Sequence, residues 1–374
     1  MKELAAILSI CSLHPENALA LATLVKASGS TYRRPGARML ILEDGGSAGS
    51  VSGGCLERDL IEKGQVAARK GESILVTYDT SAEEDIIFGV GLGCKGAVHI
   101  LVEPLRPGSA AEELIRFIGN IFHRRHSGAV ATVFQIRGDV QVRLGDRWML
   151  DSDGKVSGRL DDEGLRAKIN AATVEALSSN RSRTMEFELP GGEVEVFVEV
   201  MHSPAPMVIF GAGYDAHPLL RLAKEVGFHV TVADARPAYA QAARFPEADA
   251  VVVVRPEEIA TLGLNQRTAA VIMSHNYLTD FGFLQAVLPL NLRYLGLMGP
   301  RARTLKMLQE LQEAGLETSE DLLRKIHNPV GLDIGAENPE QIALSILAEI
   351  QAVIAGRPGG LLREKKGPIH APTH

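Results

Sequence analysis

The chain has 374 residues, of which 45% are hydrophobic, 23% charged and 5% aromatic, and its formal net charge is -7 at pH 7. This composition is typical of a globular protein and excludes an intrinsically disordered chain. The length exceeds that of most single domains and therefore predicts two, each with its own hydrophobic core. The negative charge argues against a broad basic surface, so we expect no nucleic acid partner.

Cysteine usage indicates the compartment. The chain has three cysteines, Cys11, Cys55 and Cys94, and no two of them form a Cys-x-x-Cys pair. They give neither a disulfide framework nor a four-ligand zinc signature, which fits a reducing cytoplasm. The N-terminal MKELAAILSICS lacks the features of a signal peptide, and no segment approaches the roughly 20 apolar residues that span a bilayer. We therefore expect a cytoplasmic protein without a membrane span.

Apolar periodicity and turn residues predict a first domain of mixed α/β structure over residues 1–200. We expect helices at 2–12, 55–70, 110–124 and 161–178, strands at 18–27, 38–42, 47–51, 73–79, 96–103, 129–136, 140–144 and 147–150, and a hairpin of 184–189 with 193–200. We see no internal repeat in the sequence. The first domain is thus predicted to mix sheets and helices without repeated units.

A segment with Pro204 and Pro206 predicts a linker, because proline cannot continue a strand ladder or occupy a helix interior. Beyond it we expect strands at 207–210, 228–233, 249–253, 268–273 and 292–297, and helices at 215–226, 237–243, 256–260, 279–287, 302–314, 319–325 and 338–355. This alternation is typical of a doubly wound parallel sheet. The fold class is therefore α/β, with a Rossmann-like second domain over residues 201–374 that ends in a loose tail.

A glycine turn follows the first strand of this second domain. Gly211 and Gly213 would let the backbone approach a phosphate at the start of a helix, and Asp234 ends the next strand, where it could accept from a ribose hydroxyl. Asp215 at the helix start would repel a phosphate, which weakens the case for a dinucleotide. The alternative is a turn that keeps its glycines for packing and binds nothing.

Two later strand ends of the second domain carry candidate binding residues. His275 could act as a base or donate to a phosphate, or it could be satisfied locally in its turn. Arg301 lies where it could bind an anion, although an ordinary solvated arginine is the alternative. Both positions belong to the carboxyl edge of the sheet, where open α/β sheets bind ligands.

In the first domain, the stretch GSVSGGCLERDL places a cysteine at a predicted helix start. The free N–H groups and the dipole of a helix start favour a thiolate at Cys55, which could bind a soft metal. Gly53 and Gly54 allow close approach to the backbone, and Glu57 and Arg58 add charges of both signs. The alternative is a small buried residue at a tight packing point.

Two further loops of the first domain carry suitable chemistry. In FGVGLGCKGAVHI a second cysteine, Cys94, stands beside Lys95, and a cation next to a thiol favours the thiolate. In GSTYRRPGARMLI the residues Arg33, Arg34 and Arg38 form a local basic loop. If the three loops converge, they form a pocket suited to a ligand that contains phosphate, sulfur or a metal.

Together these segments resemble the XdhC/CoxI/CoxF family, the accessory proteins of xanthine dehydrogenase and related molybdenum hydroxylases. The resemblance covers most of the chain. It is carried by GSTYRRPGARMLI, GSVSGGCLERDL and VGLGCKGAVHILVEP in the first half, and by IFGAGYDAHPLLRLAKEVGFHVTVADARP, YLGLMGPRART and RKIHNPVGLDIGAENPEQIALSILAEI in the second. Several long motifs in one order are far more specific than a single glycine turn.

The resemblance implies a chaperone that binds molybdenum cofactor (molybdopterin), protects it, supports its sulfuration and inserts it into an apo-hydroxylase. It assigns Cys55, with Gly53 and Gly54, to the region that handles the cofactor, and no residue to catalysis. The implied partners are a molybdenum hydroxylase of the xanthine dehydrogenase type, a cysteine desulfurase and, in a homodimer, a second copy of the chain. A nucleotide at the Rossmann-like domain is a further implied ligand.

Two rival interpretations remain open from the sequence. One is an NAD(P)-dependent oxidoreductase that uses Gly211, Gly213 and Asp234, with His275 as acid or base. The other is a structural one, in which the Rossmann-like half is a platform for dimerisation or for a partner protein. Binding of nicotinamide cofactor distinguishes the first rival from the chaperone.

Overall fold

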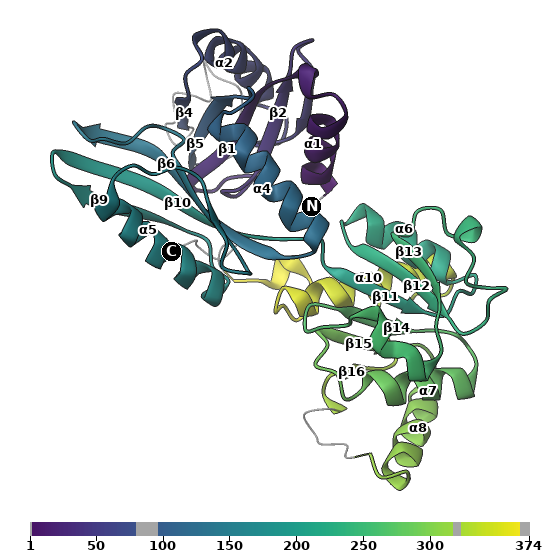
Figure 1. Cartoon of the computed structure of the whole chain (residues 1–374). Coiled ribbons are helices and arrows are strands. Elements are labelled where there is room, and N and C mark those ends of the chain that lie inside the picture. The colour runs from purple at the N-terminus through teal and green to yellow at the C-terminus, as the bar shows by residue number, and fades with distance from the viewer. Residues whose placement is uncertain (1, 80–95, 317–322, 367–374) are drawn as a thin grey trace. The chain divides into compact units, whose positions relative to one another are not determined.

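The computed structural model describes residues 2–79, 96–316 and 323–366, which fall into two compact units (Figure 1). The first unit extends from Lys2 to Ser203 and the second begins at Pro204. The division lies inside the segment that contains Pro204 and Pro206. Among the described residues, no helix has both the length and the apolar character that a membrane crossing requires.

The first unit contains two antiparallel five-stranded sheets. The first sheet has the order β3-β2-β1-β5-β4, with strands β1 (Ala18–Gly29), β2 (Arg38–Leu42), β3 (Ser47–Gly49), β4 (Ile74–Asp79) and β5 (Gly96–Pro104). The second sheet has the order β8-β7-β6-β10-β9, with strands β6 (Ser127–Gly138), β7 (Arg147–Asp151), β8 (Val156–Ser157), β9 (Arg183–Leu189) and β10 (Gly192–His202). Numbered within its own sheet, each set of strands therefore has the same order, with the third, second, first, fifth and fourth strands side by side.

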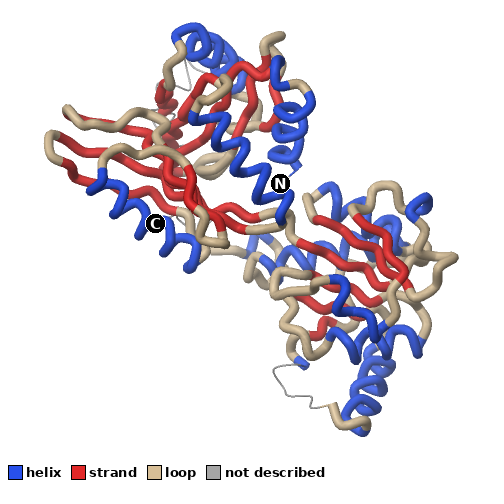
Figure 2. Tube along the Cα trace, in the orientation of Figure 1, coloured by secondary structure: helices blue, strands red, loops and turns tan. Residues whose placement is uncertain are grey.

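The helices of this unit repeat in the same way. Each half begins with a helix, has three strands, a second helix and two more strands. Figure 2 shows these helices in blue and the strands in red. The helices are α1 (Lys2–Leu13) and α2 (Glu57–Lys70) in the first half, and α4 (Ala110–Arg124) and α5 (Glu163–Ser179) in the second. The unit is thus an internal duplication, and the expectation of no internal repeat is wrong.

The duplication extends to individual residues. Positions that match at one constant spacing along the chain include Thr23 with Thr132, Gly29 with Gly138, Gly36 with Gly145, Arg38 with Arg147 and Gly49 with Gly158. Even the irregularities coincide, because β1 shifts register between Leu24 and Lys26, and its equivalent β6 pairs out of register between Val133 and Gln135. The two halves therefore share one backbone design.

Packing explains the helix positions. The apolar residues of α2 pack on one face of the first sheet, and those of α5 pack on one face of the second. The other two faces share a core with α1 and α4, around Ile7, Leu40, Met149 and Ile118. The unit is thus layered helix, sheet, helix pair, sheet, helix, which buries an apolar face of every element.

The second unit is built on one six-stranded parallel sheet. Its order is β13-β12-β11-β14-β15-β16, with strands β11 (Pro206–Phe210), β12 (His229–Asp234), β13 (Ala250–Val253), β14 (Ala269–Ile272), β15 (Tyr294–Leu297) and β16 (Ile326–His327). In this order successive strands are added first toward one edge of the sheet, from β11 to β13, and then toward the other, from β14 to β16, which is the strand order of the Rossmann fold. The predicted fold class is confirmed.

Helices cover both faces of the parallel sheet. Helices α6 (Ala216–Glu225) and α10 (Pro339–Ile354) pack on one face, while α7 (Tyr277–Val287), α8 (Arg301–Glu313) and the short 3-10 helix η3 (Pro256–Leu262) pack on the other. Both faces of the sheet are buried, and its strands are accordingly almost continuously apolar.

Several elements predicted from the sequence differ from those in the structure. Residues 140–144 form a loop, because Val142 and Leu144 bury their side chains without pairing as a strand. Residues 237–243 are turns, where the Arg236 guanidinium lies 3.7 Å from the centre of the Tyr239 ring, and only a 3-10 turn, η2 (Ala242–Arg244), follows. The predicted helix at 256–260 is a 3-10 helix, and most of the one at 319–325 lies outside the described residues. Residues 356–366 contain one 3-10 turn, η4 (Leu362–Glu364).

Candidate functional site

The duplication locates the candidate site, because the two halves differ most at two connections. Residues 50–56 join β3 to α2, whereas the shorter segment 158–162 joins β8 to α5. Residues 80–95 stand between β4 and β5, where Pro190 and Gly191 alone stand between β9 and β10. Both enlargements belong to the first half and carry Cys55 and Cys94. Because the shorter connections of the second half are sufficient for the same fold, the longer ones of the first half indicate a function.

The start of α2 is built differently from the start of α5. Asp162 caps α5 by accepting from the N–H of Leu165 at 2.7 Å, whereas Leu56 at the N-cap of α2 has no capping side chain. The hydroxyl of Ser52 takes over part of this role, because it accepts from the N–H groups of Gly54 and Leu56 at 3.3 and 3.2 Å. The helix consequently begins at Glu57, two residues later than predicted, and Cys55 lies in the preceding loop.

Glu57 holds this loop together. Its carboxylate accepts from the Ser50 hydroxyl at 2.7 Å, from the Ser52 N–H at 3.0 Å and from the Ser52 hydroxyl. Burial acts to raise the pKa of Glu57, but the hydrogen bonds from Ser52 and Ser50 outweigh it and lower the pKa below its usual value. The carboxylate thus faces the loop's own backbone and hydroxyls, which makes Glu57 an organiser of the cysteine loop.

Cys55 is exposed on this loop. A Cβ atom on Gly53 would meet the Tyr32 ring at 3.6 Å, so the ring covers Gly53. Gly54 adopts a φ of 107°, which strongly favours glycine, and no atom would lie within 4 Å of a Cβ there. The thiol therefore stands beside open backbone that a ligand can approach closely.

Two of the three predicted loops converge. One small cavity is lined by Thr31, Tyr32 and Arg33 from the first loop and by Ser52 and Cys55 from the second. Gly96, at the start of β5, lines the same cavity. Cys94 itself lies outside the described residues, so its place in this convergence stays a prediction.

The three arginines of the first loop have different roles. Arg33 pairs with Glu3 of α1, and Arg34 is exposed. Arg38 is buried and donates to the Glu199 carboxylate on β10, with one contact of 3.0 Å. Arg38 therefore joins the two sheets, and of the three arginines only Arg33 lines the cavity with Cys55.

Sequence reasoning missed two tyrosines at this site. Tyr32 is 68% exposed and, as its place over Gly53 shows, offers a ring face beside the thiol. Tyr78 lines the same cavity and donates to Asp59 at 2.5 Å. Burial, and next the hydrogen bond to Asp59, raise the pKa of Tyr78. A tyrosine amid glycines in STYRRPG was the available signal for the first, since exposed aromatic residues in loops are frequent in binding sites.

In the second unit, the glycine turn adopts the expected geometry. Gly211 has a φ of 124°, and a Cβ there would lie 2.7 Å from the backbone of Met273, at the point where β11 and β14 diverge. A Cβ on Gly213 would meet no atom within 4 Å. The turn thus combines a close packing point at Gly211 with open space at Gly213.

Asp234 is fully buried at this turn. Its carboxylate accepts from the Ala212 N–H at 2.8 Å and from the Arg236 guanidinium at 2.9 and 2.8 Å. Burial acts to raise the pKa of Asp234, and the hydrogen bonds from Arg236 and Ala212 outweigh it and lower the pKa. The carboxylate therefore braces the glycine turn and is not turned outward toward a ribose hydroxyl.

The other two candidates of the second unit are exposed. His275 has a φ of 60° and places Nε2 2.9 Å from Asp215 Oδ2. Arg301 is exposed at the start of α8. The neighbouring Asp280 is buried and accepts from the Ser274 N–H and from Arg303 at 3.0 and 2.7 Å. Asp280 thus fixes the turn that presents His275, a role the sequence analysis did not identify.

Within the described ranges, no group of three or more His, Cys, Asp or Glu side chains is placed to hold a metal ion. Cys55 contributes a single soft ligand atom. A metal bound there needs ligands beyond this thiol, such as the sulfur atoms of a metal complex.

Two family models match the chain. The model of the XdhC and CoxI family matches residues 12–79 and 122–188, and the model of the XdhC Rossmann domain matches residues 207–350. The gap in the first match contains the connection at 80–95, β5 and most of α4. The two matches together cover most of the chain.

Similar proteins give a consistent result. The chain is 31% identical over 340 residues to a Bacillus subtilis protein described as a probable xanthine dehydrogenase subunit, covering 90% of this chain and 94% of that protein. It is 25% identical over 334 residues to the molybdenum cofactor insertion chaperone PaoD of Escherichia coli, covering 89% and 82%. A crystal structure described as a xanthine dehydrogenase from Bacillus halodurans superposes with a TM-score of 0.76 at 28% identity, covering 96% and 97%.

Proposed function

The chain belongs to the XdhC and CoxI family, and on that premise we propose that it is a maturation factor for a molybdenum hydroxylase of the xanthine dehydrogenase type. In this proposal it binds the molybdenum cofactor, a molybdopterin with its metal, and protects it. It supports sulfuration of the cofactor by a cysteine desulfurase and inserts the cofactor into the apo-hydroxylase. The name of the E. coli relative, a molybdenum cofactor insertion chaperone, supports the cofactor as cargo.

One observation carries the site assignment. The exposed Cys55 shares a cavity with Tyr32 and Arg33 in the half of the duplicated unit whose connections are enlarged. The second half has the same backbone design and lacks this cysteine loop, so folding alone does not require it. We therefore assign cofactor handling to the loop of Gly53, Gly54 and Cys55.

The residues present fit this cargo. The Cys55 sulfur is a soft donor of the type that binds molybdenum-group and other thiophilic metals. The open backbone at Gly54 allows a bulky group to approach, and the Tyr32 ring offers a surface for a planar pterin. Arg34, exposed in the same loop as Tyr32 and Arg33, supplies a cation for an anionic group of the cargo. Glu57 positions the loop and does not itself face the cargo in this proposal.

For the second unit we propose a narrower role. The open backbone at Gly213 and the exposed Arg301 are groups that could contact a phosphate, including one in a nucleotide portion of the cofactor. Asp234 is unsuited to bind a ribose because its carboxylate is buried against Ala212 and Arg236. We therefore expect nicotinamide cofactors to leave the melting temperature unchanged, whereas the oxidoreductase rival requires an increase.

The proposal is tested by reconstitution. Protein purified from a host that makes the cofactor should activate an apo-hydroxylase of the xanthine dehydrogenase type, and the Cys55→Ser variant should activate it far less. Arg69→Gln, on the exposed end of α2, is a control that should activate normally. Equal activation by wild type and Cys55→Ser would remove the thiol from the function. Homodimerisation, cytoplasmic location and the domain boundary at residue 200 stay predictions from the sequence.

A further inference from the structure

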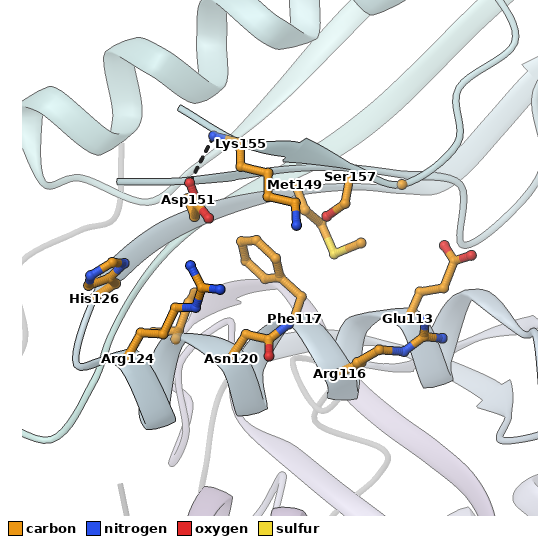
Figure 3. A pocket seen from close by; sticks show the side chains of 12 residues that line it. Glu113, Arg116, Phe117, Asn120, Arg124, His126, Met149, Asp151, Lys155 and Ser157 are labelled. Atoms are coloured by element: carbon orange, nitrogen blue, oxygen red, sulfur yellow. Dashed lines mark hydrogen bonds between the residues drawn. The ribbon is translucent and has the colours of Figure 1, made fainter. Parts of the chain in front are cut away.

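A second cavity of the first unit lies away from the cysteine loop. It has a volume of about 270 Å³ and lies between α4 and the hairpin of β7 and β8 (Figure 3). It shares no lining residue with the cavity at Cys55. Nothing in the proposed function uses this cavity.

The duplication shows that this space is not required by the fold. In the first half, a Cβ on Gly49 would meet the Ile7 side chain of α1 at 3.0 Å, and Ile7 is fully buried. Gly158 is the equivalent glycine of the second half, and it lines the cavity. The nearest side-chain atom to a Cβ there belongs to Met149, at 3.5 Å, and not to the helix. A position that one half closes by packing is therefore open in the other.

Cations face each other across the opening. Arg124, from the last turn of α4, and Lys155, from the turn before β8, direct their charged ends into the cavity from opposite walls (Figure 3). Neither has a carboxylate partner among the described residues. Two cations directed at one space repel each other, so an anion placed between them is stabilised by both.

The other charged groups of the cavity are largely committed. Arg116 pairs with Glu112 at 3.3 Å, and His126 Nδ1 lies 3.2 Å from Asp153 Oδ2. The Asp151 carboxylate accepts from the N–H groups of Asp153 and Lys155 at 3.0 and 2.8 Å, which fixes the turn that carries Lys155. Glu113 lines the far end, beside Arg116 (Figure 3). At the end that Arg124 and Lys155 form, two positive charges thus stand against the one negative charge of Asp151.

The cavity also has an apolar wall. The Phe117 ring extends from α4 (Figure 3), and Ile121 and Met149 line the cavity with it. A small planar ring would find apolar contacts on this wall, while a dianion attached to it reaches the two cations. A guanidinium and an ammonium on opposite sides suit a phosphate group, which presents oxygens in several directions.

We propose that this cavity binds a phosphate monoester with a planar ring, with the phosphate between Arg124 and Lys155 and the ring against Phe117. The phosphate ester is either a free metabolite or the phosphate-bearing part of the cofactor cargo. In both cases the binding residues are those of the second half of the duplication. The site is therefore distinct from the cysteine loop.

Calorimetric titration of the full-length protein tests the site, with adenosine monophosphate, adenosine and inorganic phosphate as probes. We expect the monophosphate to bind, inorganic phosphate to bind more weakly, and adenosine not to bind. Arg124→Gln and Lys155→Gln should each lower the affinity for the monophosphate by about tenfold or more, because each removes one charged hydrogen bond. Arg69→Gln, which removes an exposed arginine from the last turn of α2, is the control and should bind as wild type does.

Three results would overturn the proposal: no heat with any probe up to about 10 mM, equal binding of adenosine and its monophosphate, or unchanged affinity in both variants. Raising the salt concentration should weaken binding of the monophosphate, because salt screens exposed charges. Cofactor content of purified Arg124→Gln then identifies the source. Loss of pterin from this variant assigns the site to the cargo's phosphate, and unchanged pterin assigns it to a separate metabolite.

Discussion

Arg147 on β7 and Glu103 on β5 form a two-pronged ion pair between the two sheets, with one contact of 2.8 Å and both side chains only 2% exposed. The duplication repeats this relationship in reverse, since Arg38 on β2 pairs with Glu199 on β10. Each half thus contributes one arginine that donates hydrogen bonds to the other half and one glutamate that accepts them. Such reciprocity is what a two-fold interface between two copies of one surface produces.

Removing one partner of this pair should destabilise the first unit strongly. Glu103→Gln leaves the Arg147 guanidinium buried without a counter-charge, which costs about 3–5 kcal/mol in comparable cases. Glu193→Gln is the matched control, because Glu193 pairs with an exposed arginine, Arg137, and such pairs contribute about 0–1 kcal/mol. Urea unfolding of the three proteins measures the difference. A Glu103→Gln variant as stable as the control would contradict a structural role for the pair.

Glu57 should control the order of the cysteine loop without touching the cargo. Glu57→Ala removes the acceptor for Ser50 and Ser52, so we expect faster amide hydrogen exchange over residues 50–56 and reduced cofactor retention, although Cys55 remains. Glu62→Ala, an exposed glutamate on the same helix, should leave both unchanged. Unaltered exchange in Glu57→Ala would show that the loop is held in another way.

The same carboxylate sets a pH dependence. The pKa of Glu57 is lowered in the folded protein, so its stabilising effect is complete above the unfolded value of about 4.3 and is lost as the pH falls through the folded pKa. We therefore expect exchange protection of residues 50–56, normalised to intrinsic rates, to be constant from neutral pH to about pH 5 and to decrease below it. In Glu57→Ala this acid-induced loss of protection should be absent.

Thiol reactivity should separate two of the cysteines. Burial raises the pKa of Cys11 to about 11, whereas Cys55 is exposed. Alkylation at about pH 8 should therefore modify Cys55 and leave Cys11 intact, because the thiolate is the reactive form. Peptide mass spectrometry reads each site separately. Modification of Cys11 at the rate of Cys55 would contradict its burial.

Asp234 should stabilise the second unit rather than bind a ligand. Asp234→Asn weakens the interactions with Ala212 and Arg236 and should cost about 1.5–3 kcal/mol in thermal unfolding of that unit. Asp249→Asn, at an ion pair with Lys224 that is more exposed, is the control and should cost less. A stability unchanged from wild type would return Asp234 to the set of ligand-binding candidates.

The parallel sheet was predictable because its elements are locally encoded. Apolar strands alternate with helices, and the glycine turn after β11 marks the start of the first helix. The direction of the Asp234 side chain was not predictable, since the same residue at a strand end can face a ribose or its own turn. Only the position of Arg236, two residues later, was available as a signal for the inward direction.

The duplication was missed because so few positions carry it. The strands need only apolar side chains on their buried faces, so Leu24 can stand where Val133 stands without any sequence identity. The two halves have identical residues where the structure tolerates no other residue, at glycines with positive φ and at the buried Arg38 and Arg147. A search for ATLVKASG against ATVFQIRG would have found the repeat.

The candidate site could be located from the sequence only in part. The glycines around Cys55 predicted an accessible loop, and the loop does share a cavity with Tyr32 and Arg33. The separation of roles within GSTYRRPGAR could not be predicted, because burial of Arg38 depends on Glu199, far away along the chain. Long-range pairing of this kind leaves no local pattern.

The most direct test of the central claim is anaerobic co-purification from a host supplied with molybdate, with molybdenum and released pterin measured per chain. Wild type and Cys11→Ser should carry both in near-stoichiometric amounts, and Cys55→Ser, with an unchanged melting temperature, should lose most of them. Folded wild-type protein without pterin, or a Cys55→Ser variant that retains as much cofactor as wild type, would contradict the assignment of the cysteine loop to the molybdenum cofactor.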